Sequence, residues 1–179
     1  MRLRRVLIIC GGTLAAAGLT AGGLAMASSP RSTGTPPGPW QDYRSQPFTQ
    51  AAGEVCPFAL HGDIVKDEEQ VRNLLTYPDG SPQEQQFRGP LVIKFTNQSN
   101  GKSVVRDLNG TGWWFYGKDG TIYGRGTDHM GLGIHKVNTS PAPGEYYLSG
   151  TFDFVLNADG TRDFTFERGS AENLCQTLA

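Results

Sequence analysis

The sequence lacks the motifs of familiar enzyme and cofactor sites. It contains no nucleophile elbow, P-loop, dinucleotide fingerprint, calcium loop or zinc-ligand spacing. Two glycine pairs, Gly124 with Gly126 and Gly131 with Gly133, lack the strand–turn–helix setting of a phosphate-binding loop. The sequence therefore indicates no catalytic residue, no cofactor and no metal ligand, and it leaves open whether the protein is an enzyme.

Basic residues are scarce beyond the first few positions. The chain has 16 Lys and Arg against 17 Asp and Glu, and no basic run follows Arg5. The first 27 residues contain three of the arginines, so without them 13 basic residues face 17 acidic ones, a net charge of −4. Nucleic acids and anionic membranes require clustered Lys and Arg. We therefore predict no nucleic-acid or membrane partner for the mature chain, and expect a small molecule, a glycan or another protein.

Only one long apolar run is present, at the N-terminus. Three arginines precede an uncharged stretch from Val6 to about Leu24, and Ala25-Met26-Ala27 has the small residues of a signal-peptidase site. This pattern predicts a signal peptide over residues 1–27 and a secreted protein, exported by the Sec or the twin-arginine route. The alternative is an uncleaved N-terminal membrane anchor, because residues 6–27 are long enough to span a bilayer.

Cysteine is rare as well. Of the three cysteines, Cys10 lies in the predicted signal peptide, which leaves Cys56 and Cys175 in the mature chain. An even pair in an exported protein predicts one disulfide. The bond would join positions near the two ends of the folded part, and the chain-entropy model assigns such a closure about 4–5 kcal/mol of stabilisation.

Helical periodicity is almost absent and is seen only over residues 170–178. Asn-Gly and Asp-Gly pairs recur instead, between short runs of β-branched and aromatic residues, and these pairs tolerate the positive φ of tight hairpins. The pattern predicts an all-β fold, an antiparallel meander closed as a small up-and-down barrel, with a short C-terminal helix; a two-sheet β-sandwich is the alternative. The first predicted strands cover residues 55–66, 71–77, 83–87, 91–97 and 102–108.

The segment 28–53 is rich in proline, serine and glycine. Such a composition buries too little apolar surface to offset the entropy lost on ordering. We predict a flexible tail over 28–53, in which only Trp40, Tyr43 and Phe48 are suited to dock on the fold. The secreted β-domain is then predicted to cover residues 54–179.

Side-chain alternation sets the register of a C-terminal hairpin. A three-residue loop, 158–160, with Gly160 left-handed, places Phe154 opposite Phe164 and keeps the phenylalanines on one face. The hairpin of residues 91–108 is less determined, since loops of two and three residues fit it equally well.

An aromatic hairpin earlier in the chain is the best candidate for ligand binding. It has the same Asp-Gly-Thr turn, so Trp113 and Tyr123 fall on one face and Trp114 and Tyr116 on the other. One face can enter the core, whereas the other needs a cover or a ligand. We therefore predict that Trp113, Trp114, Tyr116 and Tyr123 bind a ligand; the alternative is plain core packing.

Two other functions stay open. Asp153 and Asp163 would be diagonal neighbours on one face, about 7–8 Å apart, a separation that overlaps that of inverting glycosidases. A secreted hydrolase or isomerase would use these carboxylates or the loop with Asp128 and His135. The loop 138–145, stiffened by two prolines, would suit a secreted inhibitor or similar protein–protein module.

Several short stretches resemble a known group of proteins. These are Cys-Pro-Phe at 56–58, the stretch GPLVIKFTNQSNGKSV that begins at Gly89, the repeated Asp-Gly-Thr turns, and Leu174-Cys175. From Cys56 to the C-terminus the chain is similar to small secreted actinobacterial proteins of unknown function, all-β and with two cysteines. The resemblance implies secretion and an all-β fold, and it transfers no catalytic residue.

Overall fold

The structure is a computed structural model of the chain, and it describes residues 36–179. The predicted signal peptide, residues 1–27, lies outside the described residues. Residues 36–179 form two antiparallel sheets and one short C-terminal helix, which confirms the predicted all-β class.

The larger sheet has seven strands and the smaller sheet has four. Their strand orders are β1-β4-β5-β8-β9-β10-β11 and β2-β3-β6-β7. The elements are β1 (Gln41–Asp42), β2 (Phe48–Gln50), β3 (Leu60–Asp67), β4 (Gln70–Thr76), β5 (Pro82–Gly89), β6 (Leu91–Asn97), β7 (Ser103–Asp107), β8 (Gly110–Tyr116), β9 (Ile122–Ile134), β10 (Gly144–Leu156), β11 (Arg162–Asn173) and α1 (Leu174–Thr177).

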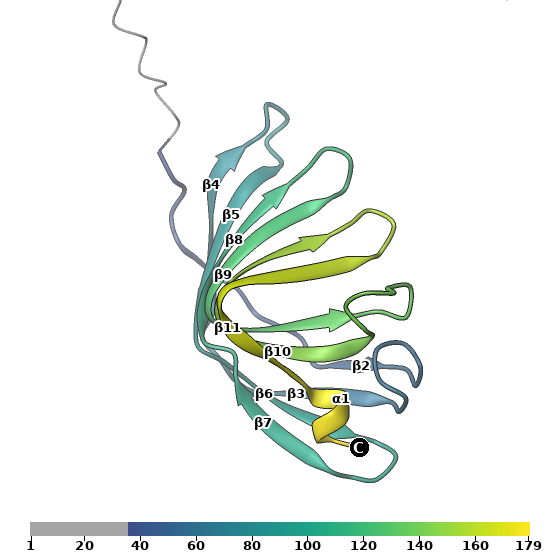
Figure 1. Cartoon of the computed structure of the whole chain (residues 1–179). Helices are drawn as coiled ribbons and strands as arrows, with labels where there is room; N and C mark the ends of the chain where they lie inside the picture. The colour runs from purple at the N-terminus through teal and green to yellow at the C-terminus, as the bar shows by residue number, and fades with distance from the viewer. Residues whose placement is uncertain (1–35) are drawn as a thin grey trace, which may run out of the picture. The chain divides into compact units, whose positions relative to one another are not determined.

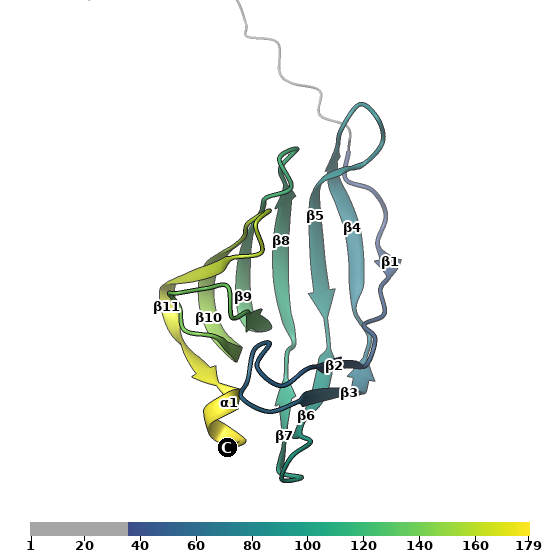
Figure 2. The same cartoon turned by 90° about the vertical axis from the view of Figure 1, so that its right-hand side faces the viewer.

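The predicted barrel is wrong, because neither sheet closes on itself within residues 36–179. β1 and β11 lie at opposite edges of the seven-stranded sheet instead of pairing. The physical reason is that the chain passes three times from one sheet directly into the other, almost without a connecting loop. β3 runs into β4, β5 into β6 and β7 into β8, with only one or two residues between the members of each pair (Figure 1, Figure 2).

The long strands bend at one level, in a row of neighbouring positions on successive strands. This bend row consists of Gly89, Gly110, Asp128, Gly150 and Gly169, each paired with the next across the larger sheet. All except Gly110 have positive φ, from 71° at Asp128 to 138° at Gly169. Glycine is the residue that adopts such φ values without steric strain, so the bend depends on the glycines of this row.

Two hydrophobic clusters fill the fold. One packs α1 and the turn before β3 against the smaller sheet; its buried members are Val55, Cys56, Leu60, Leu91, Ile93, Phe95, Leu108, Leu174, Cys175 and Leu178. The other draws on both arms of the bent strands β9 and β10; its buried members are Leu132, Ile134, Leu148, Phe152 and Phe154.

The glycine pair Gly124 and Gly126 has a packing role. Phe154 is paired with Gly124 and Phe152 with Gly126 across β9 and β10. A β-carbon at either glycine would overlap the phenylalanine ring that covers it. The two glycines therefore make room for the largest side chains of the second cluster.

The predicted registers of both aromatic hairpins are confirmed. Phe154 pairs with Phe164, and Phe115 pairs with Tyr123. In the C-terminal hairpin, Gly160 is left-handed with φ of 87° at the end of the three-residue loop. These local predictions hold because the turn residues and the two-residue period of a strand act within a few positions of one another.

The hairpin of β6 and β7 differs from both expected loops. The Asn97 amide donates to the Lys102 carbonyl over 2.9 Å, which leaves four residues between them. The Asn97 side chain, itself buried, donates to the Leu178 carbonyl over 3.0 Å. This contact with the C-terminal end of the chain lies outside the reach of any local turn rule.

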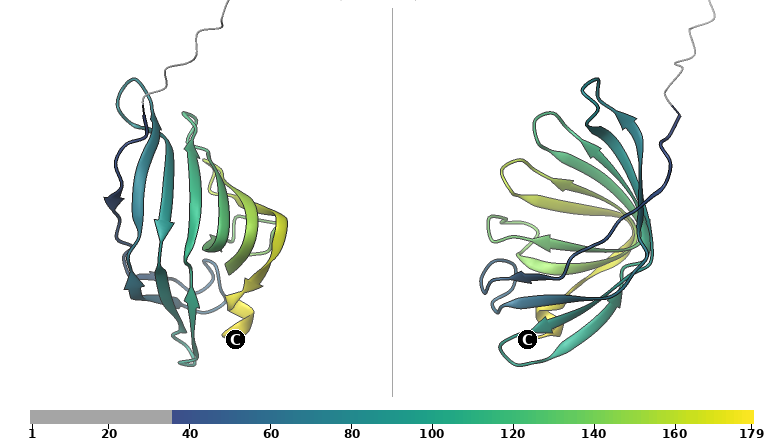
Figure 3. Two further views of the ribbon diagram at one scale, coloured as in Figure 1. Left: turned by 90° about the vertical axis from the view of Figure 1, so that its left-hand side faces the viewer. Right: turned by 180° about the vertical axis from the view of Figure 1, so that it is seen from behind.

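β1 and β2 lie within the segment 28–53, which the sequence predicts to be a flexible tail. β1 pairs with β4 and β2 with β3, so residues 41–50 run along the edges of both sheets (Figure 3). The guanidinium groups of Arg72 and Arg88 lie over the Trp40 ring, 4.5 and 3.8 Å from its centroid. The tail prediction is therefore wrong for this part, and the folded region begins before Glu54.

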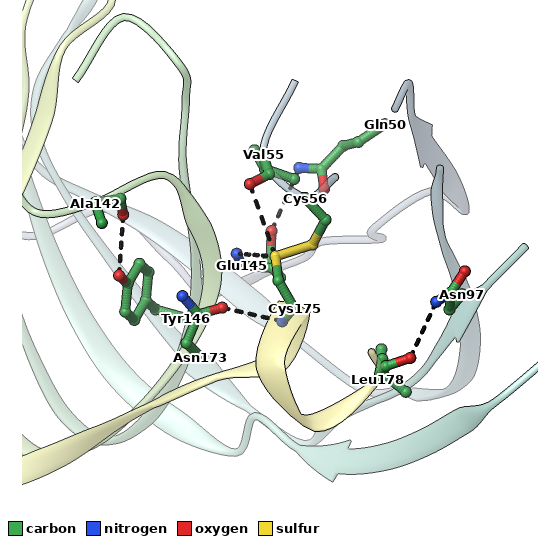
Figure 4. Close-up of a disulfide and its surroundings, with 10 residues drawn as sticks. All are labelled: Gln50, Val55, Cys56, Asn97, Ala142, Glu145, Tyr146, Asn173, Cys175 and Leu178. Carbon is green, nitrogen blue, oxygen red and sulfur yellow. Dashed lines mark hydrogen bonds between the residues drawn. A yellow bond between two sulfur atoms is a disulfide. The ribbon is translucent and has the colours of Figure 1, made fainter. Parts of the chain in front are cut away.

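Cys56 and Cys175 form the predicted disulfide, with Cα atoms 5.3 Å apart (Figure 4). The strand predicted to begin at residue 55 begins only at Leu60, so Cys56 lies in the turn before it. Cys175 lies in α1, which is shorter than the predicted helix because β11 continues to Asn173. The Asn173 side chain caps α1 by accepting a hydrogen bond of 3.0 Å from the Cys175 amide.

Candidate binding cavity

A cavity of about 450 Å³ lies between the two sheets. Strands β5 and β8 line it from the larger sheet, and β6 lines it from the smaller one. Six aromatic residues contribute to its lining: Tyr43, Phe48, Phe87, Phe95, Trp114 and Tyr116. Cavities of this volume, apolar with a few polar groups, are typical of small-molecule sites.

Trp114 forms the centre of the aromatic wall. The centroid of its ring lies 5.6 Å from that of Phe87, 5.2 Å from that of Phe154 and 6.5 Å from that of Tyr116. The Tyr116 hydroxyl donates to Oε1 of Gln85 over 2.6 Å, which orients that ring. The neighbours of Trp114 thus hold it in place on one side, and its half-buried ring borders the cavity on the other.

The four predicted ligand-binding residues are divided between two faces. Trp114 and Tyr116 line the cavity. Trp113 and Tyr123 lie on the opposite face of the sheet, where Tyr123 is 55 % exposed beside its partner Phe115. Only the first two residues therefore belong to the cavity, and binding at it stays a prediction.

Glu145 is a buried carboxyl group in the cavity lining, and no motif in the sequence marks it as a site residue. It is only 5 % exposed, and its carboxyl group accepts a single side-chain hydrogen bond among the described residues, 3.3 Å from Nε2 of Gln50 to Oε2. Figure 4 shows both side chains next to the disulfide. Burial raises the pKa of Glu145 to about 7, against the opposing effects of the Gln50 hydrogen bond and the charge of Arg162.

The glycine pair Gly131 and Gly133 makes room for this carboxyl group. A β-carbon at Gly133 would lie 3.1 Å from Oε2 of Glu145, and one at Gly131 would lie 3.4 Å from Oε1. The pair that resembles part of a phosphate loop thus shapes a carboxylate pocket. A glutamate within a strand is expected to face solvent. No local signal in the sequence indicates that Gly131 and Gly133 of the neighbouring strand β9 make room for its side chain.

We predict that Glu145→Gln changes the pH dependence of folding stability. The pKa of Glu145 is about 7 in the folded chain and 4.5 as the ordinary value, so between these pH values the folded state keeps a proton that the unfolded state has released. The resulting stabilisation is complete below about pH 4.5 and is lost as the pH rises through about 7, by about 3 kcal/mol in total.

Urea denaturation of both proteins from about pH 5 to about pH 8 tests this expectation. The wild type should lose free energy of unfolding relative to Glu145→Gln as the pH rises. The same substitution at the exposed Glu68 is the matched control. Parallel stability profiles for wild type and Glu145→Gln would contradict the expected effect.

A strap, residues 43–48, connects β1 to β2 and borders the cavity. The Ser45 amide donates to Oδ2 of Asp67 over 2.7 Å, and the Ser45 hydroxyl donates to Oε2 of Glu69 over 2.8 Å. The Tyr43 ring meets Phe87 edge-on at 5.4 Å. Burial raises the pKa of Glu69, with the Ser45 hydrogen bond opposing it. The segment expected to be a spacer is therefore part of the cavity wall.

The carboxylates considered for hydrolysis lie away from the cavity. Asp153 and Asp163 share the outer face of the last hairpin as diagonal neighbours, as predicted. Asp153 forms an ion pair of 3.6 Å with Arg125, which also pairs with Glu167. The carboxylate of Asp163 accepts a hydrogen bond from a backbone amide, that of Phe164, at 2.7 Å. These contacts are typical of a solvated sheet face.

His129 and the proline-containing loop 138–145 also contact other parts of the fold. His129 stacks on Tyr147 at 5.2 Å, with Nδ1 2.9 Å from the tyrosine hydroxyl. The side-chain Oδ1 of Asn138 accepts a hydrogen bond of 2.9 Å from the Arg162 amide, so the loop 138–145 is anchored at its start. Since Glu145 at its end is buried, only the middle of this loop is exposed.

Two further findings concern the part of the chain from residue 36 onward. None of its helices has the length and apolar character needed to cross a membrane. Nor does it gather three or more His, Cys, Asp or Glu side chains in the manner of a metal site.

Comparison with known proteins yields no relative: no protein-family model, curated protein or solved structure matches the chain. The resemblance to small secreted actinobacterial proteins accordingly stays a prediction. Function must be argued from the chemistry of the cavity itself.

Proposed function

We propose that the protein is a secreted, non-catalytic β-domain that binds a small, largely apolar molecule in the cavity between its two sheets. The observation that supports this most directly is a cavity of about 450 Å³ whose lining combines six aromatic rings with a smaller polar part. Phe48 and Trp114 pack against the two hydrophobic clusters on the cavity border, so a ligand in the cavity would extend the apolar packing of the fold.

The predicted signal peptide and the disulfide support the extracellular location. A disulfide persists in oxidising compartments and is rare in the cytosol. The two-sheet arrangement supports a β-sandwich with an internal cavity as the finer description of the fold. An uncleaved N-terminal anchor would place the same domain outside the cell, on the membrane.

We predict that Trp114→Ala weakens binding of the neutral apolar dye Nile red at least about tenfold, which corresponds to about 1.4 kcal/mol. The matched control is Trp113→Ala, which removes the same side chain from the opposite face of the same strand and should leave dye affinity unchanged. Dye fluorescence measures binding, and thermal unfolding checks the fold of each variant.

Because Trp114 also contacts Phe154, Trp114→Phe serves as a second variant that keeps part of this packing. It should bind the dye with an affinity between those of wild type and Trp114→Ala. Equal losses in the Trp113 and Trp114 variants would place the dye outside the cavity. If the wild type binds no dye, the proposed function is overturned.

A further inference from the structure

We infer that the ligand of this cavity is an organic cation, an amine on an apolar body, and that the carboxyl group of Glu145 binds its positive charge. This inference rests on the proposed function, because it names the class of molecule that the same cavity accepts. It is carried by the charges of the lining, by the unmet hydrogen-bonding capacity around Glu145 and by the aromatic wall.

The charge available to a ligand in the cavity is negative. The lining contains two carboxyl groups, Glu69 and Glu145, and one guanidinium group, Arg88. It also contains the imidazole of His129, whose Nδ1 lies 2.9 Å from the Tyr147 hydroxyl. Arg88 is occupied elsewhere: its guanidinium lies 3.8 Å from the centroid of Trp40 and donates to Oε1 of Gln70 over 3.1 and 3.3 Å. An anionic ligand would face two carboxyl groups while the guanidinium of the lining is engaged by Trp40 and Gln70, which is unfavourable in a desolvated site.

The surroundings of Glu145 lack hydrogen-bond donors. Its carboxyl group has about four acceptor positions, and the described residues fill one of them, through Gln50 at 3.3 Å. Oε1 of Gln50 is itself buried without a partner. Buried acceptors are normally satisfied, and an unsatisfied one costs about 1–3 kcal/mol. A ligand ammonium group brings the donors that this end of the cavity lacks.

The aromatic wall favours the same class of ligand. The faces of Phe87, Trp114 and Tyr116 carry the negative part of the ring quadrupole, which attracts a cation within about 6 Å. They also provide the apolar surface that the body of such a ligand buries. A carboxyl group and aromatic rings in the lining of one cavity together favour a ligand with a positive charge on an apolar frame.

Few charged groups compete for the Glu145 carboxyl group. β2 presents the neutral Gln50, β9 presents two glycines, and the β11 residue Arg162 supplies the one opposite charge acting on it. The Arg162 guanidinium donates to the Gly133 carbonyl over 2.8 Å, and no ion pair joins it to Glu145 among the described residues. The raised pKa of Glu145 agrees with this picture, since a bound cation would release the proton that burial retains.

Three matched probes test the inference on the intact mature protein: 1-naphthylmethylamine, the neutral 1-ethylnaphthalene and the anionic 1-naphthylacetate. Their affinities are measured by displacement of Nile red at about pH 8. The amine should bind at least about tenfold more tightly than the neutral probe, and the anion should bind more weakly than either. The affinity for the amine should rise between about pH 5 and about pH 8, whereas that for the neutral probe should stay constant.

Two variants test which carboxyl group binds the positive charge of the amine. Glu145→Gln should remove the advantage of the amine and the pH dependence while preserving the affinity for 1-ethylnaphthalene. Glu69→Gln is the matched control and should retain both properties. If the advantage is lost in Glu69→Gln instead, the assignment to Glu145 is overturned.

The outcomes separate this inference from the proposed function. If the amine and the neutral probe bind wild type equally, the cavity binds small molecules without charge selection, and only the inference fails. If neither the dye nor any probe binds, the proposed function fails with it. The comparison of probes on wild type needs no variant, so a misfolded Glu145→Gln protein would leave the test intact.

Discussion

Replacing Cys56 and Cys175 together by alanine is expected to lower the free energy of unfolding by about 4–5 kcal/mol. The bond joins positions separated by 119 residues, so its loss frees the unfolded chain more than a short loop would. Both cysteines are buried, at 1 % and 7 % exposure, and α1 is held to the turn before β3 by this bond. A domain of this size has only about 5–15 kcal/mol in total, so the loss amounts to about a third of the free energy of unfolding or more.

Urea denaturation of the double variant at neutral pH provides the measurement. Wild type treated with dithiothreitol serves as an independent control and should show a similar loss. A loss below about 1 kcal/mol would show that the buried packing around α1 holds the chain without the covalent bond.

Gly150→Ala and Gly169→Ala are each expected to cost about 3–5 kcal/mol. The φ values of 123° and 138° belong to a region that residues with a β-carbon rarely adopt. A β-carbon at Gly150 would overlap the Arg168 carbonyl oxygen, and one at Gly169 would overlap the Ser149 carbonyl oxygen. The backbone of two paired strands, β10 and β11, cannot move aside as a flexible side chain can, so the cost of the backbone strain adds to the cost of the overlap.

Two substitutions separate the two causes of the expected stability loss, the unfavourable φ value and the overlap of the added β-carbon. Gly101→Ala places a β-carbon at φ of 76° with no atom within 4 Å, so it should cost only about 1–2 kcal/mol. Asp128→Gly, in the same bend row, relieves a non-glycine residue at φ of 71° and should raise stability by about 1 kcal/mol. Thermal unfolding of the four variants measures their relative stabilities. Equal costs at Gly101 and Gly169 would refute the role of the bend row.

The bend row also explains why the site was harder to predict than the hairpins. Alternation along β8 separates Trp113 from Trp114, and the structure confirms that they lie on opposite faces. Alternation does not say which face is enclosed, because that depends on where the strand bends and what it then covers. Trp114 lines a cavity only because β5 and β8 turn over the smaller sheet at Gly89 and Gly110.

The burial of Glu145 could not be predicted from the sequence either. Its neighbours in the sequence are typical of the beginning of a strand after a proline-containing loop. Its burial comes from the paired strand, which presents Gly131 and Gly133, and from β2 through Gln50. The partners of a buried charge lie far along the chain, and a single sequence holds no local record of them.

The sequence by itself determined the β character of the chain, the turns at Gly120 and Gly160, the pairing of Phe154 with Phe164 and the choice of cysteine partners. These follow from turn chemistry and strand periodicity, which act between residues close in sequence, and from having only two cysteines to join. Only the tertiary structure decided that the strands cross between two sheets, that the segment 41–50 joins their edges, and that a carboxyl group borders the cavity. These depend on contacts between distant segments, whose energies local patterns do not encode.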